Sequence, residues 1–103
     1  MKFNVLKRPA AERDIEECFV YIAEKDLDVG ISFLVAVEDS LEQLSNFPFI
    51  GKLKEFGNEK LVGIRVWHVK GFENYSLFYS LSENSLELIR VLHGARDIED
   101  MFS

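Results

Sequence analysis

Four side chains in the second half of the sequence have the chemistry needed to cleave RNA without a metal ion. Such a reaction needs a base for the ribose 2′-hydroxyl, cations that stabilise the charged phosphorane, and an acid for the leaving oxygen. Arg65, Tyr79, His93 and Arg96 supply groups of these kinds. Against this, Tyr79 is predicted to face the core, Arg65 is equally well explained as a solvated cation, and an acidic chain attracts RNA weakly. Metal-free RNA cleavage is therefore an alternative and not the first interpretation.

Other kinds of chemistry find less support. The two histidines, His68 and His93, have no Cys, His or carboxylate at a spacing typical of a metal site, so no metal ion is expected. The sequence has neither a Gly-rich phosphate loop after a strand nor a nucleophile elbow, and no cofactor is expected. Cys18 lies on a helical apolar stripe and is predicted to be a buried small hydrophobe. Arg96 and Asp97 are as well explained by a structural ion pair as by a functional role.

Size and composition predict one compact domain that leaves apolar surface for a partner. The 103 residues are enough for a single domain, residues 1–103, and nine Phe, three Tyr and one Trp are many for this length. The net charge of −6 argues against general binding to phosphate backbones, so no direct nucleic-acid binding is expected. No signal peptide and no run of about 20 apolar residues is found, which predicts a cytoplasmic protein with no membrane contact.

The first half of the sequence predicts a short strand followed by two helices. Residues 3–6 alternate weakly and form the strand. Pro9 then opens a helix whose apolar positions recur every three or four residues up to Ile22. The segment Asp26-Leu27-Asp28 offers a break and a new cap for a second helix, which has a similar stripe, runs to about Asn46 and ends before Pro48. An antiparallel helical hairpin is favoured over a coiled coil because the stripe spans barely two heptads.

The second half predicts a loop over residues 52–60 and three strands over residues 62–69, 75–81 and 86–93. The connections between these strands are so short that they must be antiparallel hairpins. We expect the second strand to pair antiparallel with the first. The predicted fold is therefore α+β in the order β-α-α-β-β-β, with the helical hairpin packed on one face of a mainly antiparallel four-stranded sheet.

Four-residue turns between these strands would sort the side chains into two faces. This register places Trp67 opposite Phe78 and Leu77 opposite Arg90. The face expected to meet the helices contains Ile64, Val66, Tyr75, Leu77, Tyr79, Leu81, Leu86, Leu88 and Leu92. The outer face contains Arg65, Trp67, Val69, Ser76, Phe78, Ser80, Glu87, Ile89, Val91 and His93, a mixture typical of a binding surface. Trp67 is explained equally well as a partner anchor and as packing. Arg90 does not fit the helix-facing side, so either it reaches past the sheet edge to a carboxylate or the register is off by one.

An ordered set of segments resembles the ParE branch of the RelE/ParE toxin superfamily. The segments begin with Pro-Ala-Ala-Glu-Arg-Asp-Ile-Glu-Glu at positions 9–17 and Tyr-Ile-Ala at 21–23. They continue with residues 41–44 followed by Pro48 and Gly51, Ile-Arg-Val-Trp at 64–67, and residues 75–79. They end with Arg-Val-Leu-His-Gly-Ala-Arg-Asp at 90–97, and together they cover nearly the whole chain.

The resemblance implies the toxin of a bacterial type II toxin–antitoxin pair, of the kind also called plasmid stabilisation systems. Such a toxin would inhibit DNA gyrase without being an enzyme, and a small antitoxin would neutralise it by wrapping around it, in a homodimer or a hetero-oligomer. The residues assigned to antitoxin or target binding are Arg65, Trp67, Phe78, His93 and Arg96. RelE-type relatives instead cut messenger RNA on the ribosome. That alternative would use Arg65, His93 and Arg96, but Ser76 stands about where those ribonucleases carry an Arg, and the tail after Asp97 has neither a Tyr nor a base. A non-toxic binding module that only pairs with an antitoxin is the third interpretation.

Overall fold

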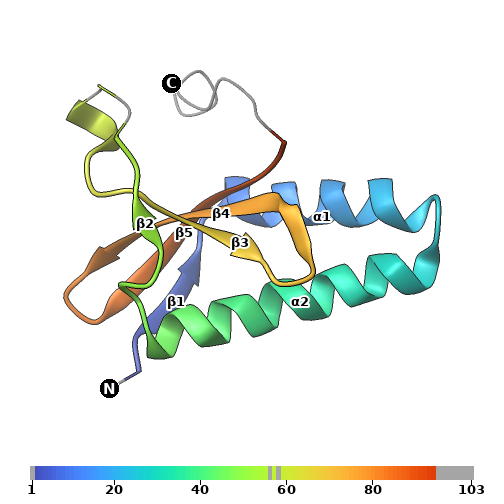
Figure 1. Ribbon diagram of the computed structural model, residues 1–103, viewed down its shortest axis with the longest axis horizontal. Coiled ribbons are helices and arrows are strands. Elements are labelled where there is room, and N and C mark those ends of the chain that lie inside the picture. Colours follow the sequence, from blue (N-terminus) through green and yellow to red (C-terminus); the bar gives the residue numbers. More distant parts are fainter. Residues whose placement is uncertain (1, 56, 58, 95–103) are drawn as a thin grey trace.

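The computed structural model describes residues 2–55, 57 and 59–94. Two helices cover one face of a five-stranded sheet with the strand order β1-β5-β4-β3-β2 (Figure 1). The elements in chain order are β1 (Asn4–Lys7), α1 (Pro9–Ala23), α2 (Leu27–Asn46), β2 (Lys52–Leu53), the 3-10 turn η1 (Glu59–Leu61), β3 (Arg65–Val69), β4 (Phe72–Ser82) and β5 (Ser85–His93). The α+β class and the helical hairpin on one face are confirmed.

The helices begin and end where the sequence predicts. Helix α1 begins at Pro9, whose ring fixes a helical φ, and Arg8 before it is extended with no side-chain cap. Helix α2 is capped by Asp26, whose carboxylate accepts a hydrogen bond from the Val29 N–H at 3.2 Å. Within the described residues, no helix is long and apolar enough to cross a membrane.

The sheet differs from the prediction in strand number and in order. It has five strands and not four, because Lys52 and Leu53, in the segment predicted to be a loop, pair with β3. Strand β1 pairs with β5, and in parallel, so the expected antiparallel pair between the first and second strands is wrong. Strand β5 is buried on both faces and is therefore stabilised most by an interior position, between β1 and β4, which leaves the half-exposed β1 at the sheet edge.

The predicted register between β3 and β4 is off by one. The turn is tighter than four residues, and an irregularity between His68 and Val69 then shifts the pairing of the rest of β3. Val69 pairs with Phe72, and Trp67 consequently lies opposite Leu77 instead of Phe78. This one-residue difference moves every side chain of β3 to the other face.

A bulge shifts the register of β5 as well. Tyr79 pairs with Leu88 and Phe78 pairs with Arg90, so Ile89 is the extra residue. The predicted alternation is correct as far as Ile89 and is inverted after it.

Both faces of the sheet carry buried apolar side chains. The alternation of apolar and polar residues along the strands therefore does not indicate which face meets the helices. The cluster against the helices contains Ala11, Phe33, Val37, Leu41, Leu44, Val69, Tyr75, Leu77, Tyr79, Leu86, Leu88 and Val91, with Trp67 packed on it. The cluster on the outer face contains Leu61, Ile64, Phe78, Ile89 and Leu92, with Val66 packed on it. The predicted faces of Ile64, Val66, Leu92, Trp67, Val69 and Val91 are therefore wrong. Arg65 and His93 also leave the outer face, because they lie directly opposite Tyr79 and Tyr75.

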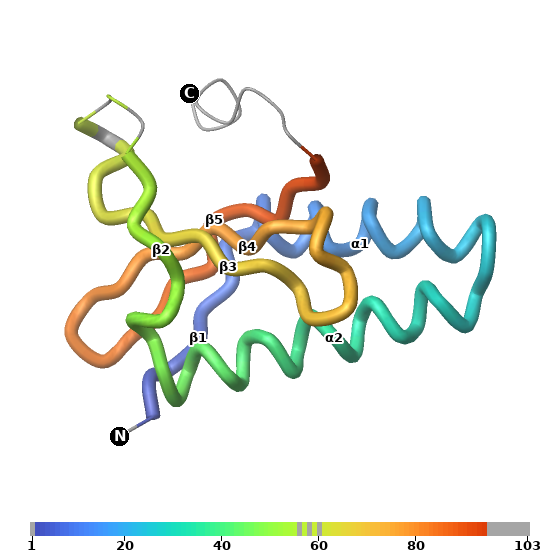
Figure 2. Tube along the Cα trace, viewed as in Figure 1, coloured from blue at the N-terminus to red at the C-terminus, as the bar shows by residue number. Residues whose placement is uncertain are grey.

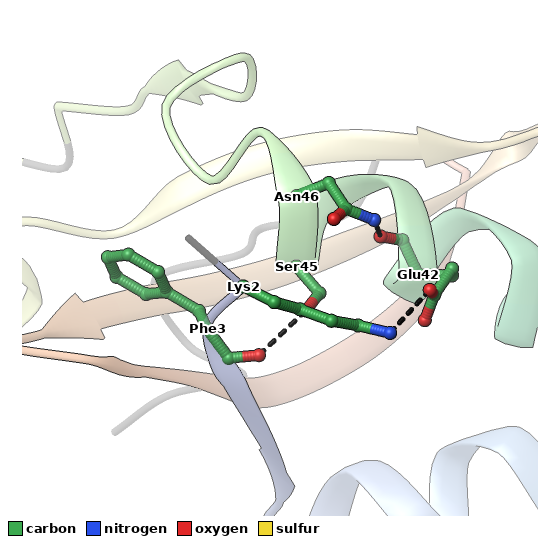
Figure 3. A network of polar contacts seen from close by, with 5 residues as sticks. All are labelled: Lys2, Phe3, Glu42, Ser45 and Asn46. Carbon is green, nitrogen blue, oxygen red and sulfur yellow. Dashed lines mark hydrogen bonds and ion pairs between the residues drawn. The ribbon is translucent and has the colours of Figure 1, made fainter.

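The amino-terminal strand is tied to the end of α2 by polar contacts (Figure 3). The Ser45 hydroxyl donates to the Phe3 carbonyl at 2.6 Å, and the Phe3 N–H donates to the Ser45 carbonyl at 2.9 Å. Lys2 forms an ion pair with Glu42 one turn earlier. These contacts fix β1 beside α2 although it has a strand neighbour on one side only.

Candidate partner-binding site at the β3 edge

Strand β3 has an open edge beyond its short pairing with β2. The Lys54 N–H donates to the Ile64 carbonyl at 2.9 Å, and alternate residues of an antiparallel strand direct their backbone groups to the same side. Val66 and His68 therefore also face β2. Strand β2 begins at Lys52, opposite Val66, and no described strand continues opposite His68. The backbone of His68 is accordingly placed to pair with a strand from a partner.

Two open grooves, each of about 680 Å³, meet at this edge. The first lies toward α2 and is lined by Asp39, Ser40, Glu42, Gln43, Trp67, His68, Lys70 and Glu73. The second lies on the outer face and is lined by Ile50, Lys52, Leu53, Lys54, Val66, Trp67, His68, Ser76 and Phe78. Trp67 and His68 line both grooves, so a bound segment that passes from one groove to the other would contact Trp67 in each. We call these two grooves together the edge grooves.

The turn at residues 48–51, which precedes β2, is held by hydrogen bonds to Tyr79 of β4. The buried Tyr79 hydroxyl accepts a hydrogen bond from the Gly51 N–H at 3.0 Å and donates to the Pro48 carbonyl at 2.8 Å. Burial raises the pKa of Tyr79, so the hydroxyl keeps its proton, while the Gly51 N–H and Arg65 act in the opposite direction. A Cβ at position 51 would clash with the Tyr79 ring, which explains the glycine.

Arg65 braces the same turn from its other side. Its guanidinium donates to the carbonyls of Gly51 at 2.7 Å and Phe49 at 3.2 Å and lies 5.1 Å from the centre of the Phe49 ring. The turn is thereby rigid, yet the Phe49 side chain remains 67% exposed, and Leu53 in the following strand is 59% exposed. These apolar side chains stand beside the outer groove without being needed in the core, as is common for residues that contact a partner.

The charges around the edge grooves differ from one groove to the other. The groove toward α2 has three carboxylates and one cation, whereas the outer groove has two cations and no carboxylate; the charged residues are Asp39, Glu42, Glu73 and Lys70 in the first and Lys52 and Lys54 in the second. A bound segment of mixed charge would therefore be held in one direction, because the reverse direction places like charges together.

Comparisons with known proteins identify the family. The family model described as the ParE toxin of the type II toxin–antitoxin system parDE matches residues 5–98. The chain belongs to the ParE toxin family. Among solved structures, a chain of the chromosomal ParDE toxin–antitoxin system from P. aeruginosa is similar with a TM-score of 0.71 at 10% identity, over 91% of this chain and 98% of that one. At this identity the likeness shows the fold alone. A comparison with curated proteins finds no match.

In this ParE-family chain, the residues predicted to bind a partner fall in different places. Trp67 and Phe78 both line the outer groove, although Phe78 is only 1% exposed and contributes mainly to the outer apolar cluster. Arg65 holds the turn before β2. Arg96 lies outside the described residues. Binding roles for these side chains stay predictions.

His93 lies at the end of β5, away from the edge grooves. Its ring is 4.5 Å from the ring of Tyr75, centre to centre, and both line a hollow of about 300 Å³ together with Glu17, Cys18 and Tyr21. Burial, helped by the charges of Asp14 and Glu17, raises the pKa of the Cys18 thiol to about 11. The thiol is therefore protonated near neutral pH, as a packing role predicts.

Three of the four residues considered for RNA cleavage, Arg65, Tyr79 and His93, lie in the described part of the chain, and these three do not form one site. Arg65 pairs with Tyr79 and His93 pairs with Tyr75, four positions along β4, so the two pairs are separated by about 13 Å of strand. The Tyr79 hydroxyl and the Arg65 guanidinium are also engaged with the turn at 48–51. The described residues contain no group of three or more His, Cys, Asp or Glu side chains that could hold a metal ion.

Arg90 of β5 forms an ion pair with Asp14 of α1. Its Nε and Nη2 atoms donate to Asp14 of α1 at 2.6 and 2.9 Å, and the Val91 N–H donates to the same carboxylate at 3.0 Å. The hydrogen bonds to Asp14 raise the pKa of Arg90 further above its ordinary value, against the effect of burial. Both alternatives for Arg90 are thus confirmed: it reaches past the sheet edge, and the predicted register was off by one. An Arg within an apolar strand was the sequence signal, whereas nothing singled out Asp14 as its partner.

Proposed function

We propose that this ParE-family toxin inhibits DNA gyrase and is neutralised by a cognate antitoxin that binds across the β3 edge. The family match over residues 5–98 supports the toxin role. Gyrase is the target that the resemblance to the ParE branch implies. The observation that carries the antitoxin site is the open edge at His68, with grooves on both of its sides and Trp67 between them.

The edge grooves suit an extended segment that becomes ordered on binding. Backbone pairing at His68 would provide affinity, and side chains entering the two grooves would provide specificity. Trp67 is the natural anchor because a large aromatic side chain buries much apolar area at small entropic cost.

Trp67→Ala tests the antitoxin site. We expect antitoxin affinity to fall by about thirtyfold, which corresponds to about 2 kcal/mol. Trp67 packs only partly on the core, so the loss of unfolding free energy should be smaller. The probe is the product of the adjacent reading frame, with affinity measured by calorimetry and stability by urea denaturation. Leu6→Ala, a change at an exposed position on β1, is the control. Unchanged affinity would place the antitoxin elsewhere.

The gyrase proposal is tested with purified components. The chain should block supercoiling of relaxed plasmid by gyrase at micromolar concentration and should cause cleaved DNA to accumulate. Absence of both effects, for protein shown to be folded by circular dichroism, would refute gyrase as the target.

The ribonuclease and the non-toxic binding module are the competing functions. The separation of Arg65 from His93 and the engagement of Arg65 with backbone carbonyls weigh against the ribonuclease. Primer extension on translated messages after induction should then show no new cuts. Expression without growth arrest would favour the binding module.

A further inference from the structure

The tip of the helical hairpin, residues 16–35, carries apolar side chains that the fold does not use. Val20, Leu27, Ile31 and Val35 are 49%, 58%, 48% and 54% exposed. Leu27, Ile31 and Val35 follow one another at intervals of four, so they form a continuous stripe along the surface of α2. Such a stripe on an exposed helix face is typical of a surface that a partner covers.

The tip is rigid and projects beyond the sheet. Figures 1 and 2 show that the end of α1 and the start of α2 extend past the turn between β3 and β4, at the end of the long axis opposite β2. The two helices touch closely there, since a Cβ at Gly30 would lie only 2.8 Å from the Ala23 Cβ. A projecting, rigid apolar element loses little conformational entropy when it binds.

The charge around the stripe indicates the chemistry of the partner. Residues 16–35 contain five carboxylates and one cationic side chain, a net charge of −4, whereas all other positions contain thirteen carboxylates and eleven cationic side chains, a net charge of −2. A second hollow of about 440 Å³ on α1 is lined by Val20 and Tyr21 together with Glu16, Glu17, Glu24 and Arg13. Lys25 already lies 4.5 Å from the centre of the Tyr21 ring, which shows that this region accepts a cation beside apolar surface.

We propose that the hairpin tip is the surface by which the toxin contacts its target enzyme, at a basic surface of the kind with which that enzyme holds DNA. This inference rests on the proposed function. An enzyme that binds DNA presents clustered Lys and Arg, which complement the acidic hairpin, whereas a second copy of this chain would oppose one acidic hairpin with another. The edge grooves are lined by none of residues 16–35, so a segment bound there leaves the tip free for a different protein.

Removing the stripe is the direct test. In the triple variant Leu27→Ala, Ile31→Ala and Val35→Ala, the helix is preserved because Ala has the highest helix propensity. We expect the concentration that half-inhibits gyrase supercoiling to rise by about tenfold or more. The control is Leu6→Ala with Val62→Ala, which removes side chains that are 55% and 78% exposed elsewhere. Inhibition by the control should stay within about twofold of wild type.

Charge neutralisation provides a second test. Glu16→Gln with Glu24→Gln should weaken binding to immobilised gyrase at low salt and should reduce the dependence of that binding on salt concentration. A salt dependence equal to that of wild type would refute the electrostatic part of the inference.

The outcomes separate this inference from the proposed function. Wild-type protein that fails to inhibit gyrase refutes the proposed function and, with it, the target assigned to the tip. Equal inhibition by wild type and the triple variant refutes the tip alone. If the triple variant inhibits fully but no longer binds the product of the adjacent reading frame, the tip is an antitoxin surface and the inference is wrong. Loss of a wild-type dimer in sedimentation, with full inhibition, would assign the stripe to self-association.

Discussion

The carboxylate of Asp14 should contribute more to stability than any other polar group of α1. It accepts hydrogen bonds from Arg90 Nε, Arg90 Nη2 and the Val91 N–H, and the two side chains are only 10% and 20% exposed. Strand β1 ends at Lys7, opposite Leu88. Beyond this point the Asp14 carboxylate, and not a strand, forms hydrogen bonds with β5. Replacing Asp14 by Leu leaves a shielded guanidinium and a backbone donor without their acceptor.

The expected loss is large for a domain of this size. Removing one partner of a buried ion pair typically costs 3–5 kcal/mol, and the residual exposure of Arg90 places Asp14→Leu at about 3 kcal/mol. Each kcal/mol corresponds to roughly 4–8 °C for a domain near 100 residues, so the melting temperature should fall by about 12 °C or more. Arg90→Met should cost about 2–3 kcal/mol. The double variant should be less damaging than the sum of both, because neither charge is left alone.

The unfolding free energies of wild type, both single variants and the double variant, measured by urea denaturation, form a double-mutant cycle. We expect a coupling free energy of at least about 2 kcal/mol between Asp14 and Arg90. The exposed ion pair between Arg8 and Glu87, with a separation of 3.1 Å and side chains that are 49% and 39% exposed, is the control. Arg8→Met should change the unfolding free energy by less than about 1 kcal/mol. Additive losses within about 0.5 kcal/mol in the Asp14 cycle would refute the reasoning.

Two further predictions concern the packed interior. Tyr79→Phe leaves the Gly51 N–H and the Pro48 carbonyl without the hydroxyl that they contact. Urea denaturation should show an unfolding free energy lower by about 1–3 kcal/mol, and a change under about 0.5 kcal/mol would show that water replaces the hydroxyl. The pKa of the Cys18 thiol is raised from 9.0 to about 11, so at pH 8 the thiol should react with iodoacetamide about a hundredfold more slowly in the native chain than in urea. Equal rates in the two states would show that the thiol is accessible and has an ordinary pKa. Because the folded state holds this proton more tightly, the stabilisation from Cys18 is complete below pH 9 and is lost as the pH rises toward about 11.

The helices were predictable because each buries one face only. Their apolar residues recur every three or four positions, and Pro9, Asp26 and Pro48 mark their limits by local chemistry that needs no tertiary contact. The same reasoning failed for the sheet because both of its faces are covered. In β3 the side chains of Val66 and Trp67 are apolar on opposite faces, so alternation in the sequence does not say which one meets the helices.

The candidate site could be predicted only in part for a related reason. Trp67 and Phe78 were identified by residue type, and both line the outer groove. The groove itself depends on where β2 begins, and Lys52 and Leu53 have no apolar pattern that would identify a strand. The bulge at Ile89, which moves His93 to the helix side, likewise follows from tertiary packing and from no local signal.

The pairing of β1 with β5 also sets the order in which this toxin can fold. Asn4 pairs with Ser85, so the edge strand β1 can pair only after β5 has been made, across most of the chain, and closure of so long a loop is slow. Synthesis proceeds from the amino terminus, and every residue that lines the edge grooves lies between positions 39 and 78. The surface proposed for the antitoxin is therefore synthesised before β5. An antitoxin that binds at this surface would have its binding residues available before the toxin can complete its sheet.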